Sequence, residues 1–280
     1  MTNQLLRHRA IRVAILDLYA GHPNQGMRCL REILQQYADI HEMEMETDEY
    51  EVRVEHRVPD LSYDVYISSG GPGSPLASET SAWEAAYFAW LRGAEREKRQ
   101  VLFICHSFQL ACRYFELADI TRRKSTAFGV FPIHLEQEGM NEPVFSGLRD
   151  PFFAVDSRDY QVIRPDAERL RQLGAQVLAI EKERPHVPLE RAVMAIRFSD
   201  NMIGTQFHPE ADAVGMSIHL QNEDRKRTVV AEFGEEKWRS MIEQLDDPEK
   251  IRWTYSHVIP NFLDAALAPV VSGHARTSVS

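Results

Sequence analysis

Val101-Leu102-Phe103-Ile104-Cys105-His106-Ser107-Phe108-Gln109-Leu110 is the stretch on which the interpretation of the fold depends. Its first four residues are apolar, as in a buried strand, and apolar residues then recur at helical spacing. The sequence therefore predicts a sharp strand-to-helix turn at Cys105. A thiol there projects from the sheet edge, and the positive end of the helix favours the reactive thiolate. Cys105 could also be a small buried hydrophobe, as most free cysteines are.

Strand and helix patterns alternate before this stretch, which is typical of a parallel sheet with helices on both faces. We expect strands at 11–18, 43–58 and 63–69 and helices at 25–38 and 80–98. Beyond Thr126 the strand patterns have only short or polar connections and predict a more antiparallel half of the same sheet. They lie at 128–135, 152–156, 177–181, 192–198 and 202–207.

Composition excludes several classes of protein. The 280 residues are 44% apolar and 26% charged, as in globular proteins. Lys and Arg total 32 and Asp and Glu total 42, so the net charge of −10 gives no basic footprint for nucleic acid. No apolar run is long enough to span a membrane, and the N-terminus lacks the apolar core of a signal peptide. Three cysteines do not suggest a disulfide framework, so we expect a cytoplasmic protein.

Two further motifs carry candidate chemistry. Ser69-Gly70-Gly71-Pro72-Gly73-Ser74-Pro75 follows an apolar strand, and its glycines would let backbone N–H groups approach an anion or a developing oxyanion. Gly204-Thr205-Gln206-Phe207-His208-Pro209-Glu210 is a strand that ends in a histidine and a carboxylate. His208 could accept the thiol proton while Glu210 orients the imidazole. Each motif alone could be an ordinary turn or strand end.

The order of the three motifs resembles the class I glutamine amidotransferases, across about residues 11–210 and a final helix. The resemblance implies a doubly wound, flavodoxin-like α/β mixed sheet and glutamine hydrolysis through a cysteine thioester, which supplies ammonia. It implies Cys105 as nucleophile, His208 as base and Glu210 as orienting carboxylate. The oxyanion would be held by the loop at Gly71 and Gly73 and by the N–H of His106. Gln109 matches the family's glutamine after the nucleophile.

Two positions of the nucleophile turn depart from the family, which usually has Gly-x-Cys-x-Gly-x-Gln. Here the glycines are replaced by Phe103 and Ser107, so the local packing must differ. Near Asp159 the family often carries Ser-His-x-Asp-x-Val, and Arg158 stands in place of the histidine. Arg158 suits a substrate carboxylate or phosphate, although pairing with Asp156 or Asp159 at the surface would also explain it.

Two alternatives stay open. Phe128-Gly129-Val130-Phe131 and Ser157-Arg158 loosely resemble the homoserine O-acyltransferases, which use the same triad to move an acyl group from coenzyme A. The third possibility is a non-catalytic amidotransferase-like domain that binds a partner.

We expect one domain over residues 1–267, with a charged helical insertion at about 213–248 and a disordered tail at 268–280. The insertion could cover the site or bind a partner. No cofactor is expected, and the histidines lack the spacing of metal ligands. Expected partners are glutamine, a separate synthetase subunit and a further copy of the chain, without nucleic acid or membrane.

Overall fold

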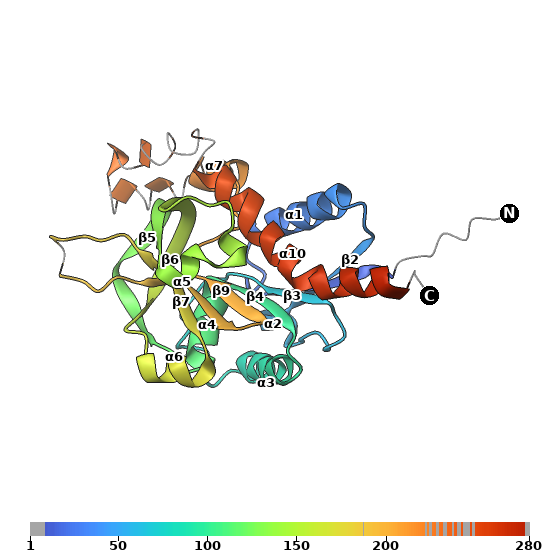
Figure 1. The fold of residues 1–280 in the computed structure, drawn as a ribbon. Helices are drawn as coiled ribbons and strands as arrows, with labels where there is room; N and C mark the ends of the chain where they lie inside the picture. Colours follow the sequence, from blue (N-terminus) through green and yellow to red (C-terminus); the bar gives the residue numbers. More distant parts are fainter. Residues whose placement is uncertain are drawn as a thin grey trace.

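The protein is described by a computed structural model, which covers residues 9–186 and 188–221, a scatter of positions between 223 and 247, and residues 250–277. In the described part of the chain, nine strands form one sheet in the order β2-β1-β3-β4-β9-β8-β7-β5-β6 (Figure 1). The strands are β1 (Ile11–Asp17), β2 (Met45–Glu51), β3 (Val65–Ser68), β4 (Gln100–Ile104), β5 (Asp119–Leu135), β6 (Phe152–Ile163), β7 (Gln176–Glu181), β8 (Val193–Ser199) and β9 (Met202–Thr205).

Strand direction divides this sheet into two halves. The strands from β2 to β9 pair in parallel, and those from β9 to β6 pair antiparallel. The doubly wound mixed α/β sheet and its more antiparallel second half are therefore confirmed. Strands β4 and β9 are neighbours although almost a hundred residues separate them, and their parallel pairing brings their carboxyl ends to one edge.

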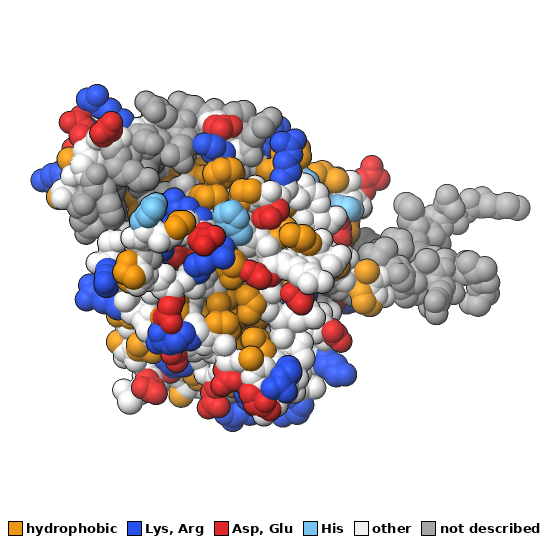
Figure 2. Space-filling model, turned by 60° about the vertical axis from the view of Figure 1, so that its left-hand side comes forward, with side chains coloured by type: hydrophobic (Ala, Val, Ile, Leu, Met, Phe, Trp, Pro, Cys, Tyr) orange, Lys and Arg blue, Asp and Glu red, His pale blue; other side chains and the backbone are white. Residues whose placement is uncertain are grey.

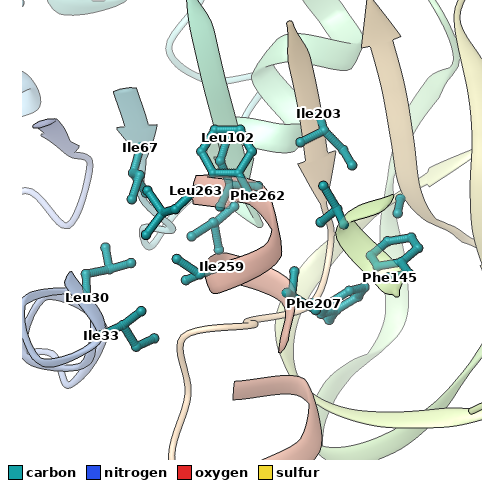
Figure 3. Close-up of a cluster of buried hydrophobic side chains, with 14 of the residues drawn as sticks. Leu30, Ile33, Ile67, Leu102, Phe145, Ile203, Phe207, Ile259, Phe262 and Leu263 are labelled. Atoms are coloured by element: carbon teal, nitrogen blue, oxygen red, sulfur yellow. The ribbon is translucent and has the colours of Figure 1, made fainter. Parts of the chain in front are cut away.

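Helices cover both faces of the sheet (Figure 1). They are α1 (Gly26–Ile40), α2 (Val52–Glu55), α3 (Ala82–Arg96), α4 (His106–Tyr114), α5 (Gln137–Met140), the 3₁₀ turn η1 (Pro143–Phe145), α6 (Ala167–Leu173), α7 (Ala213–Gln221) and α10 (Ile251–Thr277). Leu30 and Ile33 of α1 and Phe262 and Leu263 of α10 pack on one face (Figure 3). Helices α3 and α4 pack on the other face. The two apolar layers hold the sheet edge that carries the motifs in place.

Several predicted boundaries differ from the structure. The strand expected at 43–58 ends at Glu51, because residues 45–51 already pair with the whole of β1 and Val52 then turns into the core as α2 begins. Strands β5 and β6 are longer than expected, since each is the other's partner over most of its length. Of the insertion predicted at 213–248, α7 is described, and most of the remainder lies outside the described residues.

At the C-terminal end, α10 continues to Thr277 through part of the segment expected to be an unstructured tail. Residues 278–280 lie outside the described residues. Acidic and basic side chains are interspersed around hydrophobic ones on the face shown in Figure 2. Within the described part of the chain, no helix has both the length and the hydropathy required to span a bilayer.

Candidate active site

Cys105 lies at the turn between β4 and α4, as the sequence predicts. Its backbone has φ 49° and ψ −96°, a conformation that a residue with a side chain rarely adopts. The turn is held on both sides: the Cys105 N–H donates to the Thr205 carbonyl at 2.8 Å, and the Cys105 carbonyl accepts from the Gln109 N–H at 3.1 Å. The surrounding sheet and helix therefore maintain a locally strained backbone that presents the thiol at the sheet edge.

The two unusual residues of the turn are accommodated by compensating changes around it. Phe103 is fully buried, and its ring lies 5.6 Å from the ring of Phe198. Gly204 on the neighbouring strand makes room, because a Cβ there would lie only 3.2 Å from the Cβ of Phe103. The Ser107 hydroxyl turns into the protein and donates to the Ser68 carbonyl at 2.6 Å. The Ser107 hydroxyl therefore joins β3 to the turn.

His208 and Glu210 follow β9, so the pairing of β4 with β9 brings them beside Cys105. The His208 Nδ1 lies 2.8 Å from the Glu210 Oε1, and a carboxylate can only accept, so Nδ1 carries the proton. The imidazole and the Cys105 side chain lie against the same glycine, since a Cβ at Gly70 would be 2.8 Å from the His208 Cε1 and 3.6 Å from the Cys105 Cβ. Burial lowers the pKa of His208, but the negative charges of Glu210 and Cys105 and the hydrogen bond to Glu210 raise it well above its ordinary value. The site thus favours an imidazolium between carboxylate and sulfur.

The glycine loop lies beside the thiol and the imidazole. A Cβ at Gly70 would meet the His208 Cε1 at 2.8 Å, and a Cβ at Gly71 would meet the Leu18 carbonyl oxygen at 2.2 Å. Gly73 has φ +96°, which favours glycine. The guanidinium of Arg53 holds the loop from outside by donating to the carbonyls of Pro72 and Leu18 at 2.6 and 3.1 Å. The backbone of the glycine loop therefore lies close to the thiol and the imidazole, at positions where a side chain would not fit.

The His106 side chain is buried, only 2% exposed, and borders the same cavity as Cys105. Burial and the nearby charges of Arg53 and Arg113 lower its pKa to about 3, so the imidazole is neutral at pH 7. Among the described residues its Nε2 has no hydrogen-bond partner. His106 therefore brings no positive charge to the thiol.

The other candidate residues border the cavity in different ways. Gln109 is buried and donates its side-chain amide to Tyr160 and Gln206. Asp159 accepts a hydrogen bond from the Thr126 hydroxyl at 2.5 Å. Arg158 also borders the cavity, but its guanidinium is buried.

The contacts of Arg158 correct the prediction that this residue pairs with a carboxylate at the protein surface. Its Nε lies 2.9 Å from both carboxylate oxygens of Asp156, and its NH2 group lies 3.7 Å from Glu181. Its side chain is 1% exposed. The predicted pairing with Asp156 is present, but it is buried, because the Arg158 guanidinium points towards Glu181 of β7 and Met194 of β8.

A cavity of about 740 Å³ is bordered by the candidate residues and by the β1–α1 connection and α7. Tyr19 and Gly26 in this border were not identified from the sequence. A Cβ at Gly26 would meet the Tyr19 hydroxyl at 2.3 Å and the Glu210 Oε1 at 3.3 Å. Burial, Glu210 and Cys105 raise the pKa of Tyr19. The signal that could have found Tyr19 is its place just after β1, at the sheet edge where such folds bind ligands.

Comparison with known proteins agrees with this architecture. A family model described as Glutamine amidotransferase class-I matches residues 15–221. A solved glutamine amidotransferase from Thermotoga maritima has a TM-score of 0.69 and 14% identity, with 93% of this chain and 99% of that chain covered. The glutaminase domain of CTPS from Trypanosoma brucei has a TM-score of 0.58 and 15% identity, with 92% and 94% covered. These two likenesses concern the fold.

A curated homoserine O-acetyltransferase from Phocaeicola vulgatus is 28% identical over 118 residues. The match covers 41% of this chain and 37% of that protein, so the chain spans little more than a third of the length of this relative. The family model, by contrast, covers well over half of the chain and includes the glycine loop, the turn at Cys105 and the motif that ends at Glu210. The chain belongs to the class I glutamine amidotransferase family.

Proposed function

We propose that this protein hydrolyses the side-chain amide of glutamine, with Cys105 as nucleophile, His208 as proton carrier and Glu210 as its orienting carboxylate. The observation that carries the proposal is the geometry at the sheet edge: a thiol on a strained turn lies beside an imidazole whose Nδ1 lies 2.8 Å from a carboxylate. This arrangement matches the requirement of nucleophilic catalysis for a base within reach of the thiol and a third group that orients the base.

The reaction would proceed in two halves. The Cys105 thiolate attacks the amide carbon, and the His208 imidazolium gives its proton to the departing nitrogen, so that the C–N bond breaks and ammonia leaves. The γ-glutamyl thioester then reacts with water. His208 accepts a proton from this water, the C–S bond breaks, and glutamate and the thiolate–imidazolium pair result.

The remaining candidate residues would hold the substrate. Backbone N–H groups of the loop at Gly71 and Gly73, together with the N–H of His106, would stabilise the oxyanion at the amide carbon. Gln109, Arg158 and Asp159 border the cavity on the side of β6 and α4. We propose that this wall contacts the glutamyl part of the substrate.

We further propose that residues 1–267 form one domain and that ammonia passes to a separate synthetase subunit. The proposal is supported by the similarity in fold between this chain and the glutaminase domain of CTPS. Helix α7 begins directly after the triad and borders the cavity through Gly215 and Met216, which supports the proposal that the insertion covers the site or contacts the partner.

A second candidate function uses the same triad for acyl transfer from an acyl-coenzyme A to an alcohol. It is favoured by the match to a homoserine O-acetyltransferase. In that reaction the acyl group moves from the coenzyme A sulfur to Cys105 and then to the hydroxyl oxygen. The two functions share an acyl-enzyme and differ in the acyl donor.

The experiment that tests the proposal is intact-mass labelling with 6-diazo-5-oxo-norleucine, a reactive mimic of glutamine, on the wild type and on Cys105→Ala. We expect one adduct on Cys105, which excess glutamine suppresses, and no adduct on the variant. Cys105→Ala should also abolish glutaminase turnover with little loss of stability, since the thiol is small and lies at the cavity.

The other outcomes separate the alternatives. If iodoacetamide labels Cys105 selectively while the glutamine mimic does not, the thiol is activated for another substrate, and acyl-coenzyme A donors are tested next. If neither reagent prefers Cys105, a non-catalytic domain that binds a partner becomes the better description. Substantial turnover by Cys105→Ala would contradict the mechanism in every form.

A further inference from the structure

Gln206, which precedes the triad histidine by two residues, makes a contact with the nucleophile that the proposed mechanism leaves unused. Its side chain is fully buried, and its Nε2 lies 3.6 Å from the Cys105 Sγ, within the range of hydrogen bonds to sulfur. The backbone holds it there, because the Gln206 N–H donates to the Met194 carbonyl at 2.8 Å. A fully buried amide directed at the reacting atom suggests a role in the chemistry.

The orientation of this amide follows from its neighbours. Gln109 places its amide nitrogen 3.2 Å from the backbone carbonyl of Tyr160, which can only accept a hydrogen bond. The same nitrogen lies 3.0 Å from the Oε1 of Gln206. Since Gln109 presents a donor, the facing atom of Gln206 must be its oxygen. The nitrogen of Gln206 is thereby turned towards the sulfur, so one backbone carbonyl sets the orientation of both amides.

The other contacts of the sulfur explain why this donor matters. The Ser157 carbonyl lies 3.8 Å from the Cys105 Sγ and suits a protonated thiol, because a carbonyl oxygen repels a thiolate. The Gln206 N–H acts in the opposite sense, since a hydrogen bond to the charged form of a group favours that form. The His208 imidazolium also favours the charged sulfur through its own charge, but it must transfer its proton to the leaving group.

We propose that Gln206 is a catalytic residue that stabilises the Cys105 thiolate through its side-chain N–H, and that Gln109 is a positioning residue that holds the Gln206 amide in this orientation. The inference rests on the proposed role of Cys105 as nucleophile. It also changes the role of Gln109: both amide protons of this side chain are committed to Tyr160 and Gln206. Only its oxygen remains for a substrate.

The test measures the rate at which iodoacetamide alkylates Cys105 as a function of pH, which requires no glutamine. Gln206→Met fills the site but donates no hydrogen bond. A hydrogen bond to a charged group corresponds to a midpoint shift of about one to two pH units, so we expect the midpoint of alkylation to rise by this amount. Gln206→Glu keeps the oxygen that Gln109 contacts and adds a negative charge, and its midpoint should rise at least as far.

Gln109→Met should raise the midpoint as well, because the Gln206 amide loses the donor that orients it. The double variant should shift no further than Gln206→Met alone, since both changes remove the same hydrogen bond. Gln161→Met is the matched control: this amide lies on β6, contacts Arg123 and Thr121, and does not border the cavity, so the midpoint should stay unchanged.

An unchanged midpoint in folded Gln206→Met and Gln206→Glu would overturn the role of Gln206. A Gln109→Met variant that raises KM alone, with an unchanged midpoint, would show that Gln109 serves only the substrate. These failures differ from failure of the proposed function. In that case wild-type Cys105 would not react with the glutamine mimic, whatever the Gln206 variants do.

Discussion

Replacing Glu210 by glutamine isolates the contribution of its negative charge to turnover. Glutamine keeps the size of the side chain and an oxygen that can accept from the His208 Nδ1, which lies 2.8 Å from the Glu210 Oε1. Glu210 is 1% exposed, so water has little access to the imidazolium and cannot easily compensate for the loss of the negative charge. The change therefore weakens the interaction that stabilises imidazolium while the ring orientation is kept.

Two arguments bound the size of the effect. A hydrogen bond to a charged group contributes about 1.5–3 kcal/mol and a neutral one about 1 kcal/mol, so the loss is at least about 0.5 kcal/mol. A full pair of charges 4 Å apart contributes about 4 kcal/mol at an effective dielectric constant of about 20, which sets the upper bound. We expect Glu210→Gln to lower kcat between about 2-fold and about 1000-fold.

The assay is release of ammonia from glutamine at saturation, with wild type, Glu210→Gln, His208→Ala and a matched control. Glu142→Gln is that control, because Glu142 is also buried and paired with a cation, Arg197, but lies away from the cavity that Cys105 borders. His208→Ala removes the proton carrier and should lose more activity than Glu210→Gln. Full activity in Glu210→Gln, or a loss larger than that of His208→Ala, would refute the role assigned to the carboxylate.

Two further changes test the surroundings of the thiol. The pKa of His106 falls to about 3 on folding, so between about pH 6.5 and pH 3 the unfolded chain binds more protons than the native one. The His106 contribution to stability is therefore complete above about pH 6.5 and is lost as the pH falls, by about 1.4 kcal/mol per pH unit. The raised pKa of His208 has the opposite effect. Its contribution to stability is present below about pH 6.5 and is lost as the pH rises through the folded-state pKa. Urea unfolding of wild type and His106→Gln should show the variant losing less stability in acid, and parallel curves would contradict this reading. Gly71→Ala should lower kcat at least tenfold on the scale of a lost oxyanion donor, because a Cβ there would lie 2.2 Å from the Leu18 carbonyl and the loop must shift. Alkylation of Cys105 should be retained in that variant, and unchanged turnover would show that the loop does not stabilise the oxyanion.

The local features of the site can be predicted from short segments of the sequence. An apolar strand that stops at Cys105, a glycine loop after the strand at 63–69 and a histidine and carboxylate after the last strand are all readable because each depends on a few consecutive residues. The alternation of strands and helices likewise predicted the mixed sheet, since periodicity is a local property. The order of the three motifs along the chain identified the family, which the family model confirms.

Which side chains contact one another depends on the three-dimensional fold. Neighbouring positions of β4 and β9 bring Cys105 to His208 across about a hundred residues, and no local pattern shows that pairing. The burial of the His106 imidazole and the direction of the Gln206 amide depend on strand register and on partners from other elements. Arg158 is paired within a buried cluster rather than at the surface for the same reason. A sequence shows which chemical groups are present. Their charge states and contacts depend on the distances between groups, and these distances are set only when the strands pair and the chain folds.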